Sequence, residues 1–220
     1  NRERNWFEVE WHLPALVLDY KLNDKTRFEI KTFALIARRE ALGVLLRPDR
    51  SDPLGNRNLI HGKFENIGQE GRLLHKNKLF KKENVIATGY RLYKGSTLSQ
   101  QGQGNDGSDP DFYFTNPADS LGSDYDNPSW NTALYLEDIF HINEKWTVTP
   151  GIRYEYISTS SEGYYKEVFT ANGIVLENNK VYESSTKETK WVCIQLACSR
   201  RPRAFEEAHR RNIQDKFYNE

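Results

Sequence analysis

The chain has 220 residues, of which 31 are basic and 31 acidic, so no net charge attracts nucleic acid or an anionic surface. Apolar residues make up only 37% of the chain, yet aromatic residues reach 13%. No run of about 18 apolar residues occurs, which excludes a membrane-spanning helix. A membrane-spanning β-barrel is not excluded, because its strands are only about ten residues long and half polar.

The start of the chain has no targeting pattern. It opens on Asn1 without a basic segment followed by an apolar one, and it contains no methionine. We therefore expect either that the front of the protein has been removed or that the chain is an internal segment.

The first two predicted strands form a hairpin. Residues 14–22 alternate, with Leu16, Leu18 and Tyr20 on one face and Asp19 and Lys21 on the other. The polar cluster at residues 23–26 turns the chain, and residues 28–36 form the second strand. Both strands of this hairpin have aliphatic residues on one face and charged residues on the other near the turn.

Long and short connections then follow one another. Residues 38–63 are predicted as a long loop, 64–78 as a strand of weaker pattern, 79–83 as a turn and 86–92 as a strand. Residues 95–129, rich in glycine and aspartate, are predicted as a second long loop. Such a loop counts against a compact soluble domain but is expected on the outer side of a membrane barrel.

The clearest pair of strands comes last. Residues 130–142 and 146–158 both alternate and are separated by three residues. Asp138 falls on the apolar face of the first of these strands. The pattern leaves two explanations for Asp138: it lies at the headgroup level near the turn, or a bulge turns it inward.

This last hairpin resembles the mid-barrel hairpin of TonB-dependent outer-membrane receptors. In that family an acidic residue late in one strand precedes a short periplasmic turn, and the next strand reads Pro-Gly-(Ile/Leu)-Arg-(Tyr/Phe)-(Glu/Asp). The matching positions here are Asp138, Pro150, Gly151, Ile152, Arg153, Tyr154 and Glu155. Residues 67–74 and 88–93 resemble the ferric citrate and siderophore branch. The whole match covers about residues 10–158.

The resemblance implies a barrel of about 22 strands, with an N-terminal plug and a TonB box, in the outer membrane of a Gram-negative bacterium. Its implied partners are a ferric chelate, the TonB complex and outer-membrane lipid. The sequence shows neither plug nor box, and only about six or seven strands. We therefore predict an all-β, antiparallel up-and-down segment of a larger transmembrane barrel, with short periplasmic turns and long outer loops. The alternative is a small, self-contained soluble or surface β-barrel that binds a ligand.

The end of the chain departs from this pattern. We expect residues 1–190 to form the partial barrel and residues 191–220 to form an irregular or helical tail. The tail is basic and contains both cysteines, Cys193 and Cys198. Two explanations stay open: the reading frame shifts near Lys190, or the segment is an ordinary surface tail.

Candidate site residues follow from the barrel interpretation. Charges expected to face the lumen are Arg27, Glu29, Lys31, Glu70, Arg72, Arg91, Arg153 and Glu155. Arginines in or beside the first long loop are candidates to bind an anionic ferric chelate, because guanidinium groups pair with carboxylates in a bidentate way; they are Arg38, Arg39, Arg47, Arg50 and Arg57. No motif indicates a metal site, a cofactor or catalysis, so we expect no enzyme activity.

Overall fold

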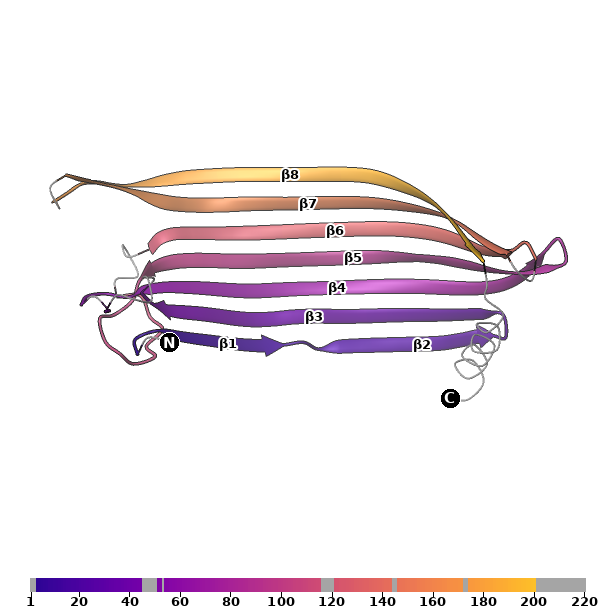
Figure 1. Cartoon of the computed structure of the whole chain (residues 1–220), viewed down its shortest axis with the longest axis horizontal. Helices are drawn as coiled ribbons and strands as arrows, with labels where there is room; N and C mark the ends of the chain where they lie inside the picture. Colours follow the sequence, from indigo (N-terminus) through magenta and orange to yellow (C-terminus); the bar gives the residue numbers. More distant parts are fainter. Residues whose placement is uncertain are drawn as a thin grey trace.

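The structure, a computed structural model, describes residues 3–44, 51–52, 54–115, 121–143, 146–171 and 174–200. Within these residues the fold is a single antiparallel sheet of eight strands, without a helix. Figure 1 shows the strands side by side in one layer. They are β1 (Trp6–His12), β2 (Ala15–Asn23), β3 (Thr26–Gly43), β4 (Asn58–Leu79), β5 (Lys82–Gln103), β6 (Leu121–His141), β7 (Trp146–Ala171) and β8 (Ile174–Arg200). The prediction of an all-β, antiparallel segment is confirmed, and the sheet is not closed.

Strands β1 and β2 lie end to end along the same edge of β3 (Figure 1). Their registers are continuous, because His12 pairs with Ile36 and Ala15 with Phe33. Between them, the amide of Ala34 donates to the carbonyl of Pro14 at 2.9 Å. Proline has no N–H to return this bond, so the ladder is interrupted there while the chain keeps its direction.

The connections differ at the two ends of the sheet. At one end, called the turn end, short turns join β2 to β3, β4 to β5 and β6 to β7. The turn between β4 and β5 uses Phe80 and Lys81, whose φ angles of 51° and 64° suit a two-residue hairpin with the twist of its strands. The opposite end, called the loop end, has the longer connections from β3 to β4 and from β5 to β6.

The strands are longer than predicted, and the loops shorter. Residues 95–103 and 121–129, predicted as loop, continue β5 and β6, while residues 38–43 and 58–63 belong to β3 and β4. β1 was not predicted either. Most of these extensions are polar on both faces. They therefore lack the alternation of apolar and polar residues by which the other halves of the same strands were predicted.

The expected boundary at residue 190 was also wrong for the first part of the tail. Residues 191–200 form the end of β8. They pair with β7 along a ladder whose last pair is Arg200 with Trp146. Val192, Ile194 and Leu196 share one face of β8, so the barrel pattern continues past Lys190. Residues 201–220 lie outside the described residues, and the proposed frame shift stays a prediction.

The register divides the sheet into two faces. Directly paired residues point to the same side, so alternation in one strand fixes the side of every residue in its neighbours. One face, called the apolar face, carries large exposed apolar side chains on several strands toward the turn end. Examples are Leu16, Leu18, Leu134, Leu136, Ile152, Tyr154 and Ile194. The other, called the charged face, carries the predicted lumen-facing charges.

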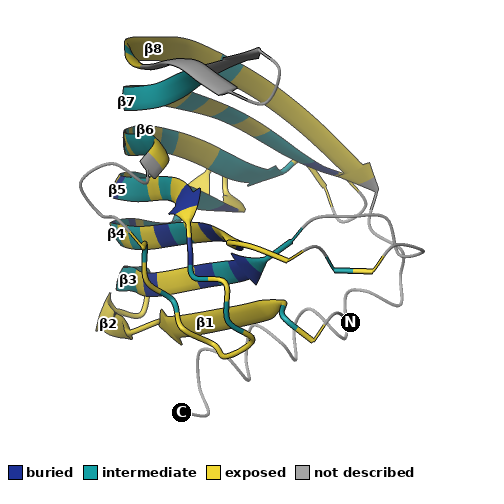
Figure 2. Cartoon of the chain, turned by 90° about the vertical axis from the view of Figure 1, so that its left-hand side faces the viewer, coloured by how far each residue is buried: buried dark blue, intermediate teal, exposed yellow. Residues whose placement is uncertain are grey.

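The described residues form no large packed core. Figure 2 shows mostly exposed and intermediate positions, and the buried apolar residues are Ala37, Leu42, Leu59, Ala87 and Ala133. Leu134 is 56% exposed and Ile194 is 81% exposed on the apolar face. A sheet with large apolar side chains on its surface requires another apolar medium on that side.

Glycines let aromatic rings lie flat across the sheet. Tyr135 pairs with Gly89 on the charged face, and a Cβ built on Gly89 would lie 2.6 Å from the Tyr135 hydroxyl and 2.3 Å from the Gly71 carbonyl oxygen. Tyr90 covers Gly71 in the same way on the other face. Position 89 therefore has no room for a side chain.

At the loop end, residues after β5 pack over the ends of β1, β3 and β4. The Arg57 guanidinium is buried beneath them and donates to the carbonyls of Arg4 (3.2 Å) and Asn105 (3.3 Å) and to the Asn105 side chain. Arg4 in turn donates to the carbonyls of Gly55, Asp106 and Gly107. Burial lowers the pKa of Arg57. These bonds fix the first part of the β5–β6 connection to the sheet.

We predict that Gly89→Val destabilises the folded sheet by about 1–3 kcal/mol, because the added methyl groups collide with backbone and with Tyr135. Urea unfolding in detergent measures this loss. Gly107→Ala is the control, since its nearest neighbour to a new Cβ lies 3.7 Å away. Equal stability of both variants would contradict the close approach at position 89.

Arg57→Gln should loosen the segment after β5, because the carbonyls of Arg4 and Asn105 lose their donor at a cost of about 1–3 kcal/mol. Limited proteolysis should then cleave within residues 104–115 faster than in the parent protein. Arg39→Gln, on an exposed position, should leave the cleavage rate unchanged.

Candidate functional site

Charged side chains form a ladder across the charged face. Arg72 Nη2 lies 3.1 Å from Glu29 Oε2 between β4 and β3, and Arg91 Nη1 lies 3.7 Å from Glu70 Oε1 between β5 and β4. Each of these pairs links two neighbouring strands through side chains that the register places opposite each other. Because these groups are partly exposed, each pair adds little stability. Each pair joins one arginine to one glutamate, so the two pairs together form a polar surface without net charge.

The ladder continues at both sides. On β7, Arg153 Nε donates to Glu155 Oε2 at 3.1 Å, and Asn131 donates to the other carboxylate oxygen of Glu155 at 2.8 Å. On the opposite side, Arg27 Nε donates to Asp19 at 2.7 Å. Sequence reasoning had placed Asp19 on this face without naming it as a site residue. All eight predicted charges therefore share one face.

A shallow, open hollow of about 220 Å³ lies in the middle of the ladder. Charges from β3, β4, β5 and β7 surround it, including Glu29, Lys31, Glu70, Arg72, Arg91 and Arg153. Tyr135, which the sequence analysis did not select, also lines it because Gly89 lets the ring lie toward Arg72. The hollow can take a polar side chain or water, and its charged lining is more basic than acidic, with four basic and two acidic side chains.

The family hairpin motif lies at the turn end of β6 and β7. Asp138 pairs with Ile86 without a register shift, so no bulge turns it away from the apolar face. Asn84, which is buried, donates to Asp138 Oδ2 at 3.2 Å. Opposite Asp138, the β6–β7 ladder skips Pro150, which has no amide hydrogen. The register therefore excludes the bulge, and Asp138 stays on the apolar face with Asn84 as its hydrogen-bond partner.

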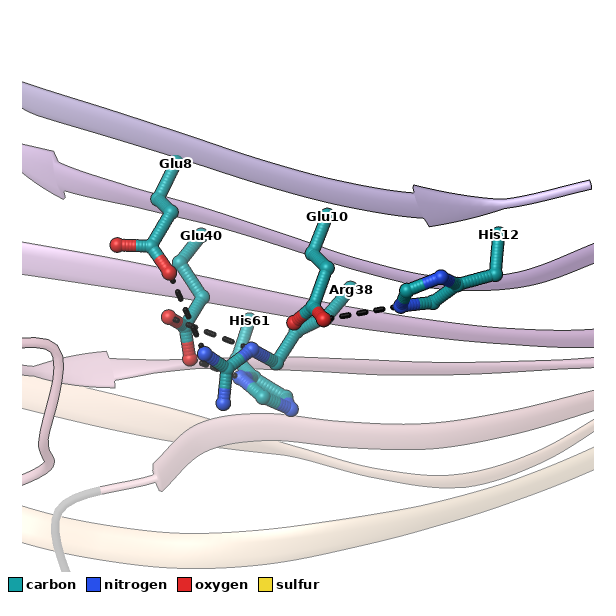
Figure 3. A network of polar contacts seen from close by, with 6 residues as sticks. All are labelled: Glu8, Glu10, His12, Arg38, Glu40 and His61. Carbon is teal, nitrogen blue, oxygen red and sulfur yellow. Dashed lines mark hydrogen bonds and ion pairs between the residues drawn. The ribbon is translucent and has the colours of Figure 1, made fainter.

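Toward the loop end, the side that carries the apolar residues becomes polar. Figure 3 shows Glu8, Glu10 and His12 from β1 beside Arg38 and Glu40 from β3 and His61 from β4. His61 Nδ1 lies 2.8 Å from the buried carboxylate of Glu40, and Arg38 lies 3.3 Å from Glu8. The hydrogen bond from His12 lowers the pKa of Glu10. The apolar surface therefore ends before this network.

The five candidate arginines lie in different environments. Arg38 belongs to the polar network, whereas Arg39 points to the charged face and stacks 5.8 Å from the Phe64 ring centre. Arg57 is buried and bonded to backbone, so it does not present its guanidinium to a ligand surface. Arg47 and Arg50 lie outside the described residues. The structure brings no two of the described candidates together.

Aromatic residues next to Arg39 were missed by the sequence analysis. Val9 pairs with Arg39, so Phe7 and Trp11 lie on the same face of β1, and they are 66% and 63% exposed. The alternation of Phe7, Val9 and Trp11 with Glu8 and Glu10 was a usable signal. This alternation runs opposite to that of β2, because in β1 the apolar residues lie on the face that carries Asp19 and Lys21 in β2.

Other chemistry has little support. Among the described residues, no three His, Cys, Asp or Glu side chains are grouped as metal ligands. Cys193 and Cys198 are free thiols, on opposite faces of β8 according to its pairing with β7. No helix within the described ranges is long and apolar enough to cross a membrane.

The chain resembles solved structures of iron-chelate receptors. It aligns with the ferric citrate transporter FecA in its unliganded form at 19% identity and a TM-score of 0.63, covering 90% of this chain and 25% of that one. With the siderophore receptor PiuA from Acinetobacter baumannii the identity is 15% and the TM-score 0.64, and the alignment covers 91% of this chain and 31% of that one. With the ferric-catecholate import receptor Fiu from E. coli K12 in its open form the identity is 13% and the TM-score 0.66, and the alignment covers 90% of this chain and 34% of that one. The chain thus spans about a quarter to a third of their length.

Sequence comparison gives the family. No curated protein matches the chain significantly. The profile of the TonB dependent receptor-like β-barrel matches residues 3–185, which is most of the chain and most of its sheet. This family and the structural neighbours are receptors and transporters rather than enzymes. The chain belongs to the TonB-dependent receptor-like β-barrel family.

Proposed function

We propose that this chain is part of the barrel wall of a receptor in the outer membrane of a Gram-negative bacterium. In this proposal the intact receptor imports a ferric chelate, either ferric citrate or a ferric siderophore, with energy delivered through the TonB complex. The neighbours named for ferric citrate, siderophore and catecholate transport support the class of ligand.

The segregation of the two faces carries the proposal. On β7, the apolar run from Trp146 to Tyr156 has the length of roughly 9–11 residues that a tilted strand needs to cross the hydrocarbon core. The alternate residues of this stretch point to the charged face, and they include Thr147, Arg153 and Glu155. A lipid-facing exterior and a water-filled, charged lumen account for both faces at once.

Arg39 is the best-placed ligand contact among the described arginines. It lies on the face assigned to the lumen, near the loop end, and its guanidinium is exposed beside Phe64. Trp11 and Phe7 add exposed aromatic surface on the same side. An arginine beside aromatic rings suits a ligand with carboxylate or phenolate oxygens and flat groups. Arg47 and Arg50 stay candidates.

Two neighbouring arginines give a matched test. Arg39→Gln in the receptor that contains this chain should raise the half-saturation concentration for radiolabelled ferric chelate about tenfold, because a charge-assisted bond is lost. Arg38→Gln, on the opposite face, should leave uptake unchanged. Equal effects of the two substitutions would contradict the assignment of the faces.

Energy coupling is tested separately. Uptake of the ferric chelate should be absent in cells that lack TonB, although the receptor still binds the chelate at the surface. Uptake that persists without TonB would contradict the proposed mechanism while leaving the barrel assignment intact.

A further inference from the structure

Three side-chain oxygens at the turn end of the apolar face are buried and have no hydrogen-bond donor. They are the Oδ1 atoms of Asn77, Asn84 and Asp138, and each belongs to a different strand. The two other such atoms among the described residues, Arg91 Nε and Asn131 Oδ1, lie on the charged face. Buried acceptors without a donor are costly, so their gathering in one place requires a physical reason.

The register places the three side chains next to one another. Asn77 pairs directly with Asn84 across β4 and β5, and Asn84 Nδ2 donates to Asp138 Oδ2 at 3.2 Å across β5 and β6. Directly opposed residues have Cβ atoms about 5 Å apart. Two oxygens on opposite sides of one calcium ion are also about 5 Å apart, since each lies about 2.4 Å from the ion. We call Asn77, Asn84 and Asp138 the oxygen triad.

The hydrogen bond to Asp138 fixes the orientation of the Asn84 amide. Turning the amide over would bring its oxygen against a carboxylate oxygen, so Asn84 Oδ1 points away from that bond. Asn84 is only 2% exposed, which excludes a bulky donor from its oxygen. One water molecule donates two hydrogen atoms and would leave one of three acceptors unpaired, whereas one metal ion can bind all three oxygens.

Asp138 adds a negative charge to the triad. Its carboxylate belongs to no ion pair formed by the described residues. Two basic side chains on the same face bond elsewhere. Lys82 Nζ donates to the Ile142 carbonyl, and His75 Nδ1 lies 2.9 Å from the hydroxyl of its strand neighbour. In the proposed arrangement this face contacts lipid, where a carboxylate is costly unless a cation neutralises it.

We propose that the oxygen triad binds a calcium ion at the turn end of the wall. Amide and carboxylate oxygens are the ligands that Ca²⁺ takes, and water completes its shell of about 6–8 oxygens. Mg²⁺ demands a nearly ideal octahedron with shorter bonds, which suits side chains fixed on three strands less well. With a single carboxylate the affinity is low, about 10⁻⁴–10⁻³ M. The ion ties β4, β5 and β6 together; only its role in neutralising Asp138 against lipid rests on the proposed function.

The test uses the receptor that contains this chain, purified in detergent and freed of divalent ions with EDTA. Equilibrium dialysis with radioactive calcium measures binding, and heat-modifiable migration on gels shows that each variant is folded. Asp138→Asn should weaken a calcium site of the parent about tenfold or more, because the ion loses its one charged ligand. Asn84→Asp should instead strengthen it about tenfold, since affinity rises with the charge of the ligands.

Glu137→Gln is the matched control, because Glu137 is the adjacent carboxylate and pairs with Gly151 on the charged face. It should leave calcium binding unchanged. Calcium binding that is the same in the parent, Asp138→Asn and Asn84→Asp, or an equal loss in Glu137→Gln, would overturn the site and leave water as the donor. Equal competition by Mg²⁺ would contradict the assignment to calcium.

Uptake of ferric chelate by the parent receptor, measured in cells, separates this inference from the proposed function. Uptake by a receptor without the calcium site would overturn the site alone. A calcium site that depends on Asp138, in a receptor that imports no ferric chelate, would support the site and overturn the proposed function.

Discussion

The alternation of side chains along paired strands is the constraint on which the rest of this structure depends. Once Ile152 lies on the apolar face, the register places Leu136, Thr88, Leu73 and Phe28 on the same side in four further strands. The same step places Arg153, Tyr135 and Arg72 on the other side. A slip of one residue would move the arginines to the apolar face, so the difference between the two faces specifies the register.

Backbone pairing imposes a second condition. In the hydrocarbon every N–H and C=O needs a partner, yet the outer edges of β1–β2 and of β8 have none within the described sheet. Both edge strands run from the loop end to the turn end, so joining them directly would make a parallel pair. Antiparallel closure instead requires an odd number of further strands running between these edges. This geometry does not favour a small, self-contained barrel, and it fits a wall segment of a larger one.

The sequence predicted those parts of the fold in which the two faces meet different media. The hairpin from Trp130 to Ser158 was found because one side contacts lipid and the other side water in the proposed arrangement. The extensions at residues 95–103 and 121–129 were missed because, in the proposed arrangement, they lie beyond the membrane with water on both sides, which removes the hydropathy period. β8 was missed for the same reason over its polar first half, and its apolar Val192 and Ile194 were assigned to a tail.

The site was predictable to a similar degree. The charges of the ladder follow from alternation alone, but their partners do not: Glu155 bonds to Asn131 on another strand, and Arg57 is buried by residues that follow β5. Spacing along the chain contains no information on such contacts. Arg38 and Arg39 point to opposite faces because both lie within β3, whereas the sequence analysis placed them in a loop, where alternation does not apply.

The central claim, that the apolar face contacts lipid and the charged face contacts water, can be measured directly. After replacement of Cys193 and Cys198, single spin labels would be placed at each position from 146 to 156 of the receptor in a bilayer. The account predicts that labels at even positions are accessible to oxygen and labels at odd positions to a water-soluble nickel chelate. The reverse phase, or accessibility without alternation, would contradict it.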